Sequence, residues 1–467
     1  MRSTAFHFLD SSFFLHSMNR HHSLHQFSRT SIWRQQWRKV RYSSGWYVAT
    51  QLLSESKRVF DFGLTLVLSL ALVPVWVGLG VMWYAGWLEI RKTIRAGRYC
   101  EPFAAYSLHF RNPRLDRFAS LIGLTELPKL LNILKGDMSL IGPRAVEPQE
   151  ISPREQKARR RFDVRPGLIC LWWIRQRANI DFGTEAEADS EYVETQSLKG
   201  DLGIVARSLP SLMYGAGGAP AHLDQVTMLG IPLDNVTMSQ AIETLMDWVT
   251  QPVQRQVTYI NPHCANIACT DPHYLKSILA SDFILADGIG MKIAGKLLAR
   301  PIRQNVNGTD LFPRLCNELQ GTGHGIFLLG GKPGVADEVK QWIATQYPGV
   351  VVSGTHHGYF SAAEEPQVIE TIRQSGADLL LVAFGVPKQD VWIHQHLPQT
   401  GAKVGMGVGG LFDFYSGRIP RAPIWMREMG LEWLYRLLQE PGRMWKRYIV
   451  GNFVFLFRVI RERLSGT

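Results

Sequence analysis

Residues 378–423 carry two apolar runs, Leu379–Phe384 and Val404–Val408, which are separated by a short helical segment. A continuous apolar run is typical of a strand buried on both faces of a parallel sheet. The stretch therefore predicts a βαβ unit. Ligands of such sheets lie beyond the carboxyl ends of the strands, and here those ends carry Gly385–Gln389 and Gly407–Gly410.

The same alternation of short apolar runs and helical stretches extends through the second half of the chain. Further predicted strands are Val257–Ile260, Phe283–Ala286, Ile326–Leu329 and Val350–Val352, and predicted helices include Met238–Val249, Val335–Tyr347 and Pro366–Ser375. Strands that alternate with helices are typical of a parallel sheet covered on both faces. We therefore predict a doubly wound, Rossmann-like α/β domain.

Glycines and cations follow the predicted strand ends. Gly330 and Gly331 lie between a strand and a helix, so backbone N–H groups there can receive phosphate oxygens. A tight turn without a ligand would use the same residues equally well. Arg418 and Arg421 follow the glycines of the last strand, and cations beside a glycine-lined crevice suit a phosphorylated ligand.

A series of ordered motifs supports a family assignment for this half. The motifs are Asn261-Pro262-His263, Ala286-Asp287-Gly288, Asn307-Gly308-Thr309-Asp310, Phe327–Gly331, Gly385–Gln389, Arg421-Ala422-Pro423 and Glu432–Arg436. In this order they resemble the TagA/WecG/CpsF glycosyltransferase family over about residues 225 to 467. The resemblance implies an inverting, metal-independent enzyme that moves a sugar from a UDP-sugar to a polyprenyl-diphosphate-linked acceptor in cell-surface polysaccharide synthesis.

Asp287 is the predicted general base. It follows the strand Phe283–Ala286, and Gly288 beside it lets the backbone approach closely. The matching Asp in the family is the proposed base that takes a proton from the acceptor hydroxyl. The alternative role is an N-cap for a helix that begins at Ile289, which is common for Asp.

Two amides are predicted substrate contacts. Asn261 and Gln389 each follow a strand and can both donate and accept, as sugar hydroxyls require. The family places substrate contacts at these positions. Its better-studied members also have a Thr and an Arg where this chain has Tyr259 and Asn305, so donor preference is expected to differ.

The tail from residue 425 to 467 mixes aromatic and aliphatic residues with arginine at helical spacing, which predicts an amphipathic appendage on a membrane surface. Four arginines near or in this tail are predicted to balance charge on the departing diphosphate, as in the family: Arg421, Arg436, Arg443 and Arg447. No Asp-x-Asp motif occurs. Arginine in place of a metal is therefore expected, with no cofactor for this half.

A dinucleotide-dependent oxidoreductase is the alternative from another class. Gly405-x-Gly407-x-x-Gly410 follows a strand, as the dinucleotide fingerprint requires. However, the glycines precede Leu411–Gly417 and two prolines rather than a helix and a second strand with an acidic end. Binding of UDP or NAD would separate the two hypotheses.

The first half begins with an uncharged segment, Phe62–Leu88, which as a helix would be roughly 40 Å long, enough to cross a bilayer. Cations flank it on both sides, and the positive-inside rule places both flanks in the cytoplasm. A re-entrant helix broken at Pro74 satisfies this rule. A simple transmembrane anchor is the alternative.

Two further stretches, Leu127–Arg144 and Val164–Leu168, resemble the bacterial sugar transferase family over about residues 55 to 215. That family comprises monotopic enzymes that move a sugar 1-phosphate from a nucleotide sugar to polyprenyl phosphate. We expect a membrane-associated, mainly helical domain over residues 55–217. Its site remnant would be Thr125, Glu126 and Arg144.

The family carries an Asp-Glu pair where this chain has Thr125-Glu126. The Asp is the phosphoryl-accepting nucleophile, and a threonine hydroxyl would need a base to replace it. The family's Lys-Phe-Arg motif also reads Ser107-Leu108-His109. We therefore expect an inactive domain, with a bifunctional enzyme, which would need Mg²⁺, as the alternative.

Net charge is +11, of which residues 1–54 and 418–467 each contribute +6. Basic ends suit anionic lipid or phosphorylated substrates, and no nucleic-acid-binding motif accompanies them.

We expect residues 1–54 to be a disordered or membrane-surface arm and residues 210–220 to be a linker. The five cysteines are expected to be unpaired, in a reduced compartment. The expected location is the cytoplasmic face of the bacterial inner membrane. The sugar, the acceptor and the oligomeric state stay open.

Overall fold

The computed structural model describes residues 44–121, 123–150, 159–178, 184–214 and 224–465. By its contacts the chain divides into a short unit, residues 1–56, and a large unit, residues 57–467, which contains both regions that the sequence suggests as separate domains. Most of the predicted arm, residues 1–43, lies outside the described residues. The rest of it is not an irregular arm, because helix α2 begins at Ser44.

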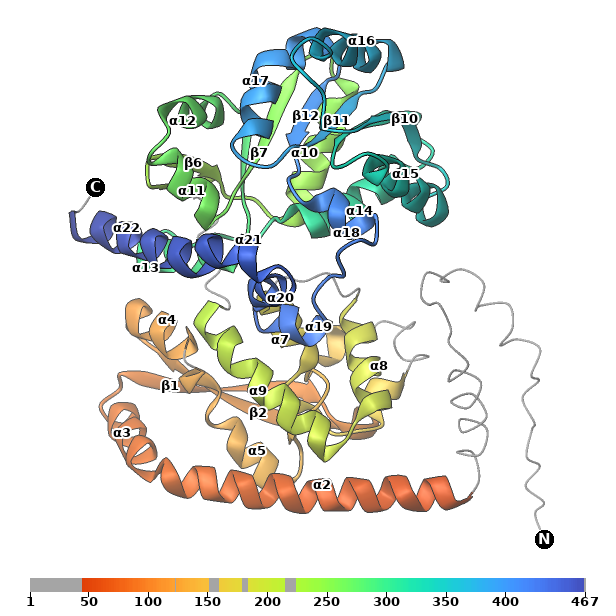
Figure 1. Cartoon of the computed structure of the whole chain (residues 1–467). Helices are drawn as coiled ribbons and strands as arrows, with labels where there is room; N and C mark the ends of the chain where they lie inside the picture. Colours follow the sequence, from red (N-terminus) through yellow and green to blue (C-terminus); the bar gives the residue numbers. More distant parts are fainter. Residues whose placement is uncertain (1–43, 122, 151–158, 179–183, 215–223, 466–467) are drawn as a thin grey trace. The chain divides into compact units, whose positions relative to one another are not determined.

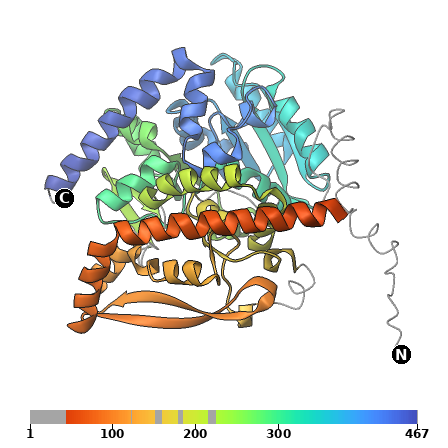
Figure 2. The ribbon, with the colours of Figure 1, turned by 90° about the horizontal axis from the view of Figure 1, so that it is seen from below.

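Two helices form the apolar segment, α2 (Ser44–Ala71) and α3 (Val73–Tyr84). The second is bent by 66° against the Glu55–Ala71 part of the first (Figure 1, Figure 2). Proline in the first turn of α3 explains the new start, since its missing N–H would be unpaired there anyway. The predicted break is thus confirmed, but the helix ends at Tyr84 and does not reach Leu88.

No single helix in the described ranges is long and apolar enough to cross a membrane. Residues Glu55–Ala71 of α2 together with α3 reach the required length and composition, but as a bent pair. Many of the apolar side chains on this pair are exposed, among them Val67, Leu70, Val77 and Trp83. Exposed apolar area on this scale is typical of a surface with a non-aqueous partner. Contact with lipid stays a prediction.

The sugar-transferase-like region contains more strand than expected. A long antiparallel hairpin joins β1 (Leu88–Ala96) to β2 (Pro102–Phe110), in a register that pairs Leu88 with Phe110. Two short strands, β3 (Ser139–Ile141) and β4 (Gly167–Ile169), pair in parallel. The prediction of a mainly helical domain is therefore incomplete, because strand pairing depends on a partner elsewhere in the chain.

Helices and turns complete this region: α4 (Pro113–Leu121), α5 (Lys129–Lys135), α7 (Leu171–Ala178), α8 (Glu185–Thr195), α9 (Leu198–Tyr214) and the 3₁₀ turns Arg98–Cys100, Leu124–Glu126, Pro148–Glu150 and Arg159–Phe162. Their core includes Ile133, Met138 and Ile174. Helix α9 continues through Pro210. The predicted linker is therefore helical up to residue 214, and its remainder lies outside the described residues.

One eight-stranded sheet forms the centre of the C-terminal region, in the order β10-β9-β11-β12-β7-β8-β6-β5 (Figure 1). Its strands are β5 (Gln225–Met228), β6 (Ile231–Asp234), β7 (Arg255–Ile260), β8 (Phe283–Ala286), β9 (Gly325–Gly330), β10 (Val351–His356), β11 (Leu379–Ala383) and β12 (Val404–Gly407). Pairing is parallel except at the β5–β6 edge. The α/β prediction is confirmed. The edge hairpin was not predicted.

Helices cover both faces of this sheet: α10 (Met238–Thr250), α11 (Pro262–Ala268), α12 (Pro272–Leu279), α13 (Ile289–Leu297), α14 (Gly308–Leu319), α15 (Val335–Gln346), α16 (Glu365–Ser375) and α17 (Lys388–Thr400). Alternate residues of a strand point to opposite faces. In β9, Ile326 and Leu328 join the core under α10, α14 and α15, whereas Phe327 and Leu329 join the core under α16 and α17.

The C-terminal appendage is helical, as predicted, and consists of α19 (Ile424–Glu428), α20 (Glu432–Gln439), α21 (Pro441–Trp445), a π-helical turn (Lys446–Val450) and α22 (Gly451–Ser465). Helix α22 packs on α11 and α13 through Phe455 and Val459. Phe453, Phe457 and Leu464 are exposed. The helix therefore has one face on the protein and apolar residues left in solvent.

Glu428, at the end of α19, is fully buried. Arg175 on α7 donates through Nε to its Oε1 at 2.7 Å, and Arg207 on α9 donates through Nη1 to its Oε2 at 2.6 Å. Arg175 also holds Glu191 through two further nitrogens. A buried carboxylate with charge-assisted bonds to both oxygens ties the appendage to the sugar-transferase-like region.

Candidate active site

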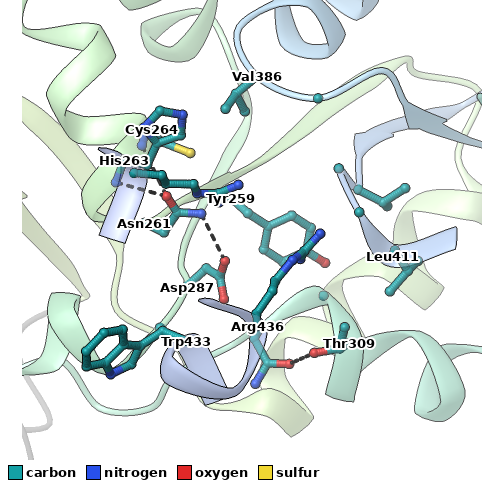
Figure 3. Close-up of a pocket in the computed structure, with 18 of the residues that line it drawn as sticks. Tyr259, Asn261, His263, Cys264, Asp287, Thr309, Val386, Leu411, Trp433 and Arg436 are labelled. Atoms are coloured by element: carbon teal, nitrogen blue, oxygen red, sulfur yellow. Dashed lines mark hydrogen bonds between the residues drawn. The ribbon is translucent and has the colours of Figure 1, made fainter. Parts of the chain in front are cut away.

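A pocket of about 990 Å³ lies at the carboxyl ends of β7, β8, β11 and β12, and the appendage forms another wall. Loops after these strands supply Asn261, Asp287, Gly385 and Gly409, and the appendage supplies Arg436. Figure 3 shows several of these side chains around one space. The crevice predicted beyond the strand ends is therefore a pocket in the structure.

Asp287 follows β8 and faces this pocket. Its Oδ2 accepts a hydrogen bond from Asn261 Nδ2 at 3.2 Å (Figure 3). Burial raises the pKa of Asp287 to about 6, while the bond from Asn261 and the charge of Arg447 oppose that rise. It does not cap α13, whose N-cap is Gly288, with φ of 91° and no side-chain bond. The carboxylate is thus set up to exchange a proton near neutral pH.

Both ends of the Asn261 side-chain amide form hydrogen bonds within the protein. Its Oδ1 accepts from the N–H groups of His263 and Cys264, both at 3.1 Å, which caps α11. Its Nδ2 is on Asp287. The side chain also lines the pocket, and its Nδ2 has a second N–H besides the one on Asp287, so contact with a substrate stays a prediction.

His263 lines the pocket, and sequence reasoning gave it no role. Burial, and to a smaller extent the charge of Arg447, lower its pKa to about 4. The imidazole is therefore neutral at pH 7. Its position in the Asn261-Pro262-His263 motif was the only signal in the sequence.

Gln389 bridges the two glycine loops rather than standing free. Its Oε1 accepts from Gly385 N at 3.1 Å and from Gly409 N at 2.9 Å, and the side chain is buried. A Cβ on Gly407 would lie 2.8 Å from Gln389 Nε2. Glycine at 407 therefore makes room for this amide, and the glycines of the dinucleotide-like run have a packing reason.

The Asn305 side chain also forms a hydrogen bond with the backbone. Its Oδ1 accepts from Gly288 N at 2.5 Å, and this bond holds the turn after Asp287. Tyr259 is buried in the floor of the pocket, where its hydroxyl lies 3.3 Å from Met406 Sδ. The two positions at which the chain departs from the family motif therefore still face the site or support it.

Gly330 and Gly331 have different surroundings. A Cβ on Gly330, which has φ of 132°, would lie 2.7 Å from the Ala383 carbonyl oxygen, so the close approach of two strand ends requires glycine. Gly331 lines the pocket together with Lys332. The next helix starts four residues later, at Val335. The tight-turn interpretation explains Gly330, and only Gly331 is placed to meet a ligand.

Three of the four predicted arginines line the pocket, namely Arg436, Arg443 and Arg447. Arg436 lies over the Phe414 ring at 5.1 Å and has a distant carboxylate at 3.8 Å, on Glu440. Arg443 is paired with Glu440 at 3.2 Å. Arg447 is in no ion pair within the described residues, and its Nε is buried without a hydrogen bond.

Arg421 is placed differently. It pairs with Asp310 at 2.9 Å and with Glu432 at 3.4 Å, and it also donates to the Thr309 carbonyl oxygen at 3.3 Å. It is not among the residues that line the pocket. Arg427, which the sequence did not suggest, lines the pocket in its place and lies 3.9 Å from Asp310.

The residues of the predicted remnant in the sugar-transferase-like region have different partners. Thr125 is buried in a 3₁₀ turn, and Glu126 contacts Lys129. Arg144 pairs with Glu185 at 2.7 Å and stacks over Trp172 at 5.2 Å. A second cation, Arg177, also interacts with the charge of Glu126, which opposes the lowering of its pKa by burial, and the sequence did not suggest this residue. Burial of Arg177 comes from tertiary packing that no local pattern predicts.

Across the described ranges, no group of three or more His, Cys, Asp or Glu side chains is arranged to hold a metal ion. The polar groups that line the pocket include the Asp287 carboxylate, amides and cations. A carboxylate with a raised pKa at one side and arginines at another suit the transfer of a group that leaves as an anion.

Comparison with known proteins identifies the family. Residues 226–467, just over half of the chain, match the model of the glycosyl transferase WecG/TagA/CpsF family. The chain belongs to this glycosyl transferase family. Residues 52–215 match the model of the bacterial sugar transferase family. The fusion suggested by the sequence motifs is confirmed, and the chain is a glycosyltransferase.

Several relatives align with the WecG/TagA/CpsF half. A Bacillus subtilis (strain 168) protein is 33% identical over 224 residues, which are 48% of this chain and 86% of the relative. A Staphylococcus aureus (strain MRSA252) protein is 30% identical over 246 residues, which are 51% of this chain and 93% of the relative. Both are named N-acetylglucosaminyldiphosphoundecaprenol N-acetyl-beta-D-mannosaminyltransferase.

The oxidoreductase alternative finds no support. The run Gly405–Gly410 leads into α18 (Leu411–Tyr415), which has only five residues. A dinucleotide site needs a longer helix whose N-terminus faces the pyrophosphate. A Cβ on Gly410 would lie 2.6 Å from Arg436 Nη2, so the glycine is needed where the loop after β12 approaches an arginine of the appendage.

Proposed function

We propose that this enzyme moves a sugar from a UDP-sugar to a polyprenyl-diphosphate-linked acceptor, with inversion and without a metal ion. The observation that carries the proposal is one pocket that joins Asp287, whose pKa is raised to about 6, to Arg436 and Arg447 of the appendage. The names of the relatives support the acceptor class, since they specify a sugar on diphosphoundecaprenol.

The mechanism is a single displacement. The acceptor hydroxyl oxygen attacks the anomeric carbon of the donor sugar, and its proton passes to Asp287. The bond between that carbon and the β-phosphate oxygen breaks, so UDP leaves with its electron pair from the opposite face. Asn261 orients the carboxylate by its 3.2 Å hydrogen bond. Arg436 and Arg447 stabilise the charge that develops on the diphosphate.

The arginines are suited to this role because neither forms an ion pair closer than 3.8 Å within the described residues. Arg447 has no carboxylate partner among the described residues, and that of Arg436 is 3.8 Å away. A fixed cation in a partly dry pocket interacts more strongly with a developing anion than it would in water. Arg421, already paired with Asp310 and Glu432, is left to support the wall of the site.

The proposed location is the cytoplasmic face of the bacterial inner membrane. Exposed apolar side chains occur on α3, for example Val77 and Trp83, and on α22, for example Phe457. Helix α22 carries arginines beside these side chains, as expected for a helix at an anionic lipid surface. A lipid-linked acceptor would reach the enzyme from the same surface.

The proposal is tested by UDP release from the purified full chain in lipid nanodiscs, with a panel of UDP-sugars and with N-acetylglucosaminyl-diphosphoundecaprenol as acceptor. Release that depends on the acceptor and persists in EDTA is expected for at least one donor. A requirement for Mg²⁺ would contradict metal independence. Binding of NAD in preference to UDP would contradict the proposed reaction class.

For the sugar-transferase-like half we propose an inactive domain that retains the fold. Thr125 stands where the family has its nucleophile, and it is buried. A threonine hydroxyl without a base cannot replace a carboxylate that is ionised at neutral pH. UMP release by the full chain, with and without Mg²⁺, tests this, beside Thr125→Asp. UMP release by the unchanged chain would make it bifunctional.

A further inference from the structure

Two cations meet where α7 of the sugar-transferase-like region approaches α13 of the glycosyltransferase region. Lys292 Nζ donates to the Arg177 carbonyl oxygen at 3.3 Å, and Lys292 is only 8% exposed. The Arg177 guanidinium lies 3.5 Å from the centroid of the Trp173 ring. Its Nε and Nη1 are buried and have no hydrogen-bond partner among the described residues.

The charged forms of both side chains are disfavoured where they lie. Burial, together with the charges of Lys296 and Arg177, lowers the pKa of Lys292 to about 8. Burial likewise lowers the pKa of Arg177 to about 10, against the opposing charge of Glu126. Within the described residues neither Lys292 nor Arg177 forms a salt bridge. Like charges held together in a poorly solvated place favour binding of an anion.

An apolar wall lies beside the cations. Ala178, Ile289 and Ile293 pack together, and all three also line the active-site pocket. Ile293 follows Lys292 directly on α13, and Ala178 follows Arg177 on α7. Arg177 and Lys292 are not themselves among the residues that line the pocket, but each is followed in sequence by a residue that is. The cations assigned to the donor, Arg436 and Arg447, come from the appendage instead.

We propose that Arg177 and Lys292 bind the diphosphate of the lipid-linked acceptor and that Ala178, Ile289 and Ile293 contact the first part of its prenyl chain. A prenyl diphosphate has the same arrangement, an anionic group joined to an apolar chain. This inference rests on the proposed function. It also gives the sugar-transferase-like half a part in the reaction of the other half, since one of the two cations comes from each.

The alternative is a structural role, in which the buried cations only pack the junction. Loss of the Lys292 charge would then leave ligand affinity unchanged and stabilise the fold, because desolvation of an unpaired ammonium would be removed. A free phosphate or nucleotide is another source of the same chemistry. The experiment must therefore separate lipid diphosphate from free diphosphate and from UDP.

The test measures binding of undecaprenyl diphosphate to the full chain in phosphatidylcholine nanodiscs, with no donor present. Variants are Arg177→Gln and Lys292→Met, and Lys276→Met is the matched control at an exposed position of α12. Loss of a charge-assisted contact is expected to weaken binding about tenfold in each of the two variants. Lys276→Met should bind as the unchanged chain does, and Lys292→Arg should recover most of the affinity.

UDP affinity is measured on the same samples, which shows that the variants fold and retain the donor site. Weaker lipid binding with unchanged UDP binding supports the proposal, even if no sugar transfer is found. Unchanged lipid binding in both variants overturns it. An equal loss of UDP affinity would assign the cations to the donor instead. Inorganic pyrophosphate that competes as well as the lipid would show a free-phosphate site and overturn the lipid assignment.

Discussion

Replacement of Asp287 by asparagine is expected to lower transfer and stabilise the fold at the same time. Loss of a general base costs roughly 10²–10⁴ in turnover. UDP affinity should stay near normal, because the donor diphosphate is assigned to the arginines. Asn keeps the shape of the side chain and its bonding to Asn261, so the structure should change little.

The stability effect follows from the pKa. A carboxyl group whose pKa rises from 3.8 to about 6 on folding is harder to ionise in the folded state. Ionised Asp287 therefore destabilises the fold above pH 6 by up to about 3 kcal/mol. The side chain is partly exposed to the pocket, so about 1–3 kcal/mol is the expected gain for Asp287→Asn at pH 7. Below pH 3.8 both states are protonated, and the gain disappears.

The assay is chemical denaturation of the full chain at pH 7.5 and at pH 4, beside acceptor-dependent UDP release between pH 5 and 8. Asp247→Asn is the control, because Asp247 is exposed on α10. The rate of transfer by the unchanged chain should fall about tenfold for each pH unit below 6, because the ionised fraction of Asp287 falls by that factor. A variant that is less stable at pH 7.5, or that transfers at the normal rate, would refute the assignment of Asp287 as a buried base.

Two further substitutions test the arginines and the link between the two halves. Arg447→Gln removes a pocket cation that lacks a carboxylate partner in the described residues, and should lower kcat/KM roughly 10²–10³-fold. Arg443, which is exposed and paired with Glu440, is the matched site, so an equal loss in Arg443→Gln would contradict the distinction. Glu428→Ala leaves Arg175 and Arg207 without their shared carboxylate. It should cost about 3–5 kcal/mol of stability, seen as a lower Tm. An unchanged Tm would show that the ion pairs of Glu428 with Arg175 and Arg207 contribute little.

Local patterns were enough for the main sheet. The apolar run Phe283–Ala286 became β8 with the predicted bounds, and Leu379–Phe384 became β11 with one residue less. Strands that are buried on both faces of a parallel sheet consist of continuous apolar runs, so the run itself identifies such a strand. The position of Asp287 at a strand end, and hence in the crevice, followed from the same reasoning.

Partners distant in sequence decided the rest. The hairpin of β1 and β2 and the edge pair of β5 and β6 were not predicted, because a strand is stabilised by the strand beside it. Arg421 and Arg447 look alike in the sequence, yet Asp310 and Glu432 neutralise the first and no described carboxylate pairs with the second.

By itself, therefore, the sequence determined the fold class, the family and the residue types at the strand ends, because these depend on local patterns and motif order. The tertiary structure decided which groups are charged, buried or free. The raised pKa of Asp287, the neutral imidazole of His263 and the cation pair of Arg177 and Lys292 all arise from burial. Burial is a property of the whole packed chain, since each side chain is desolvated by residues far from it in sequence.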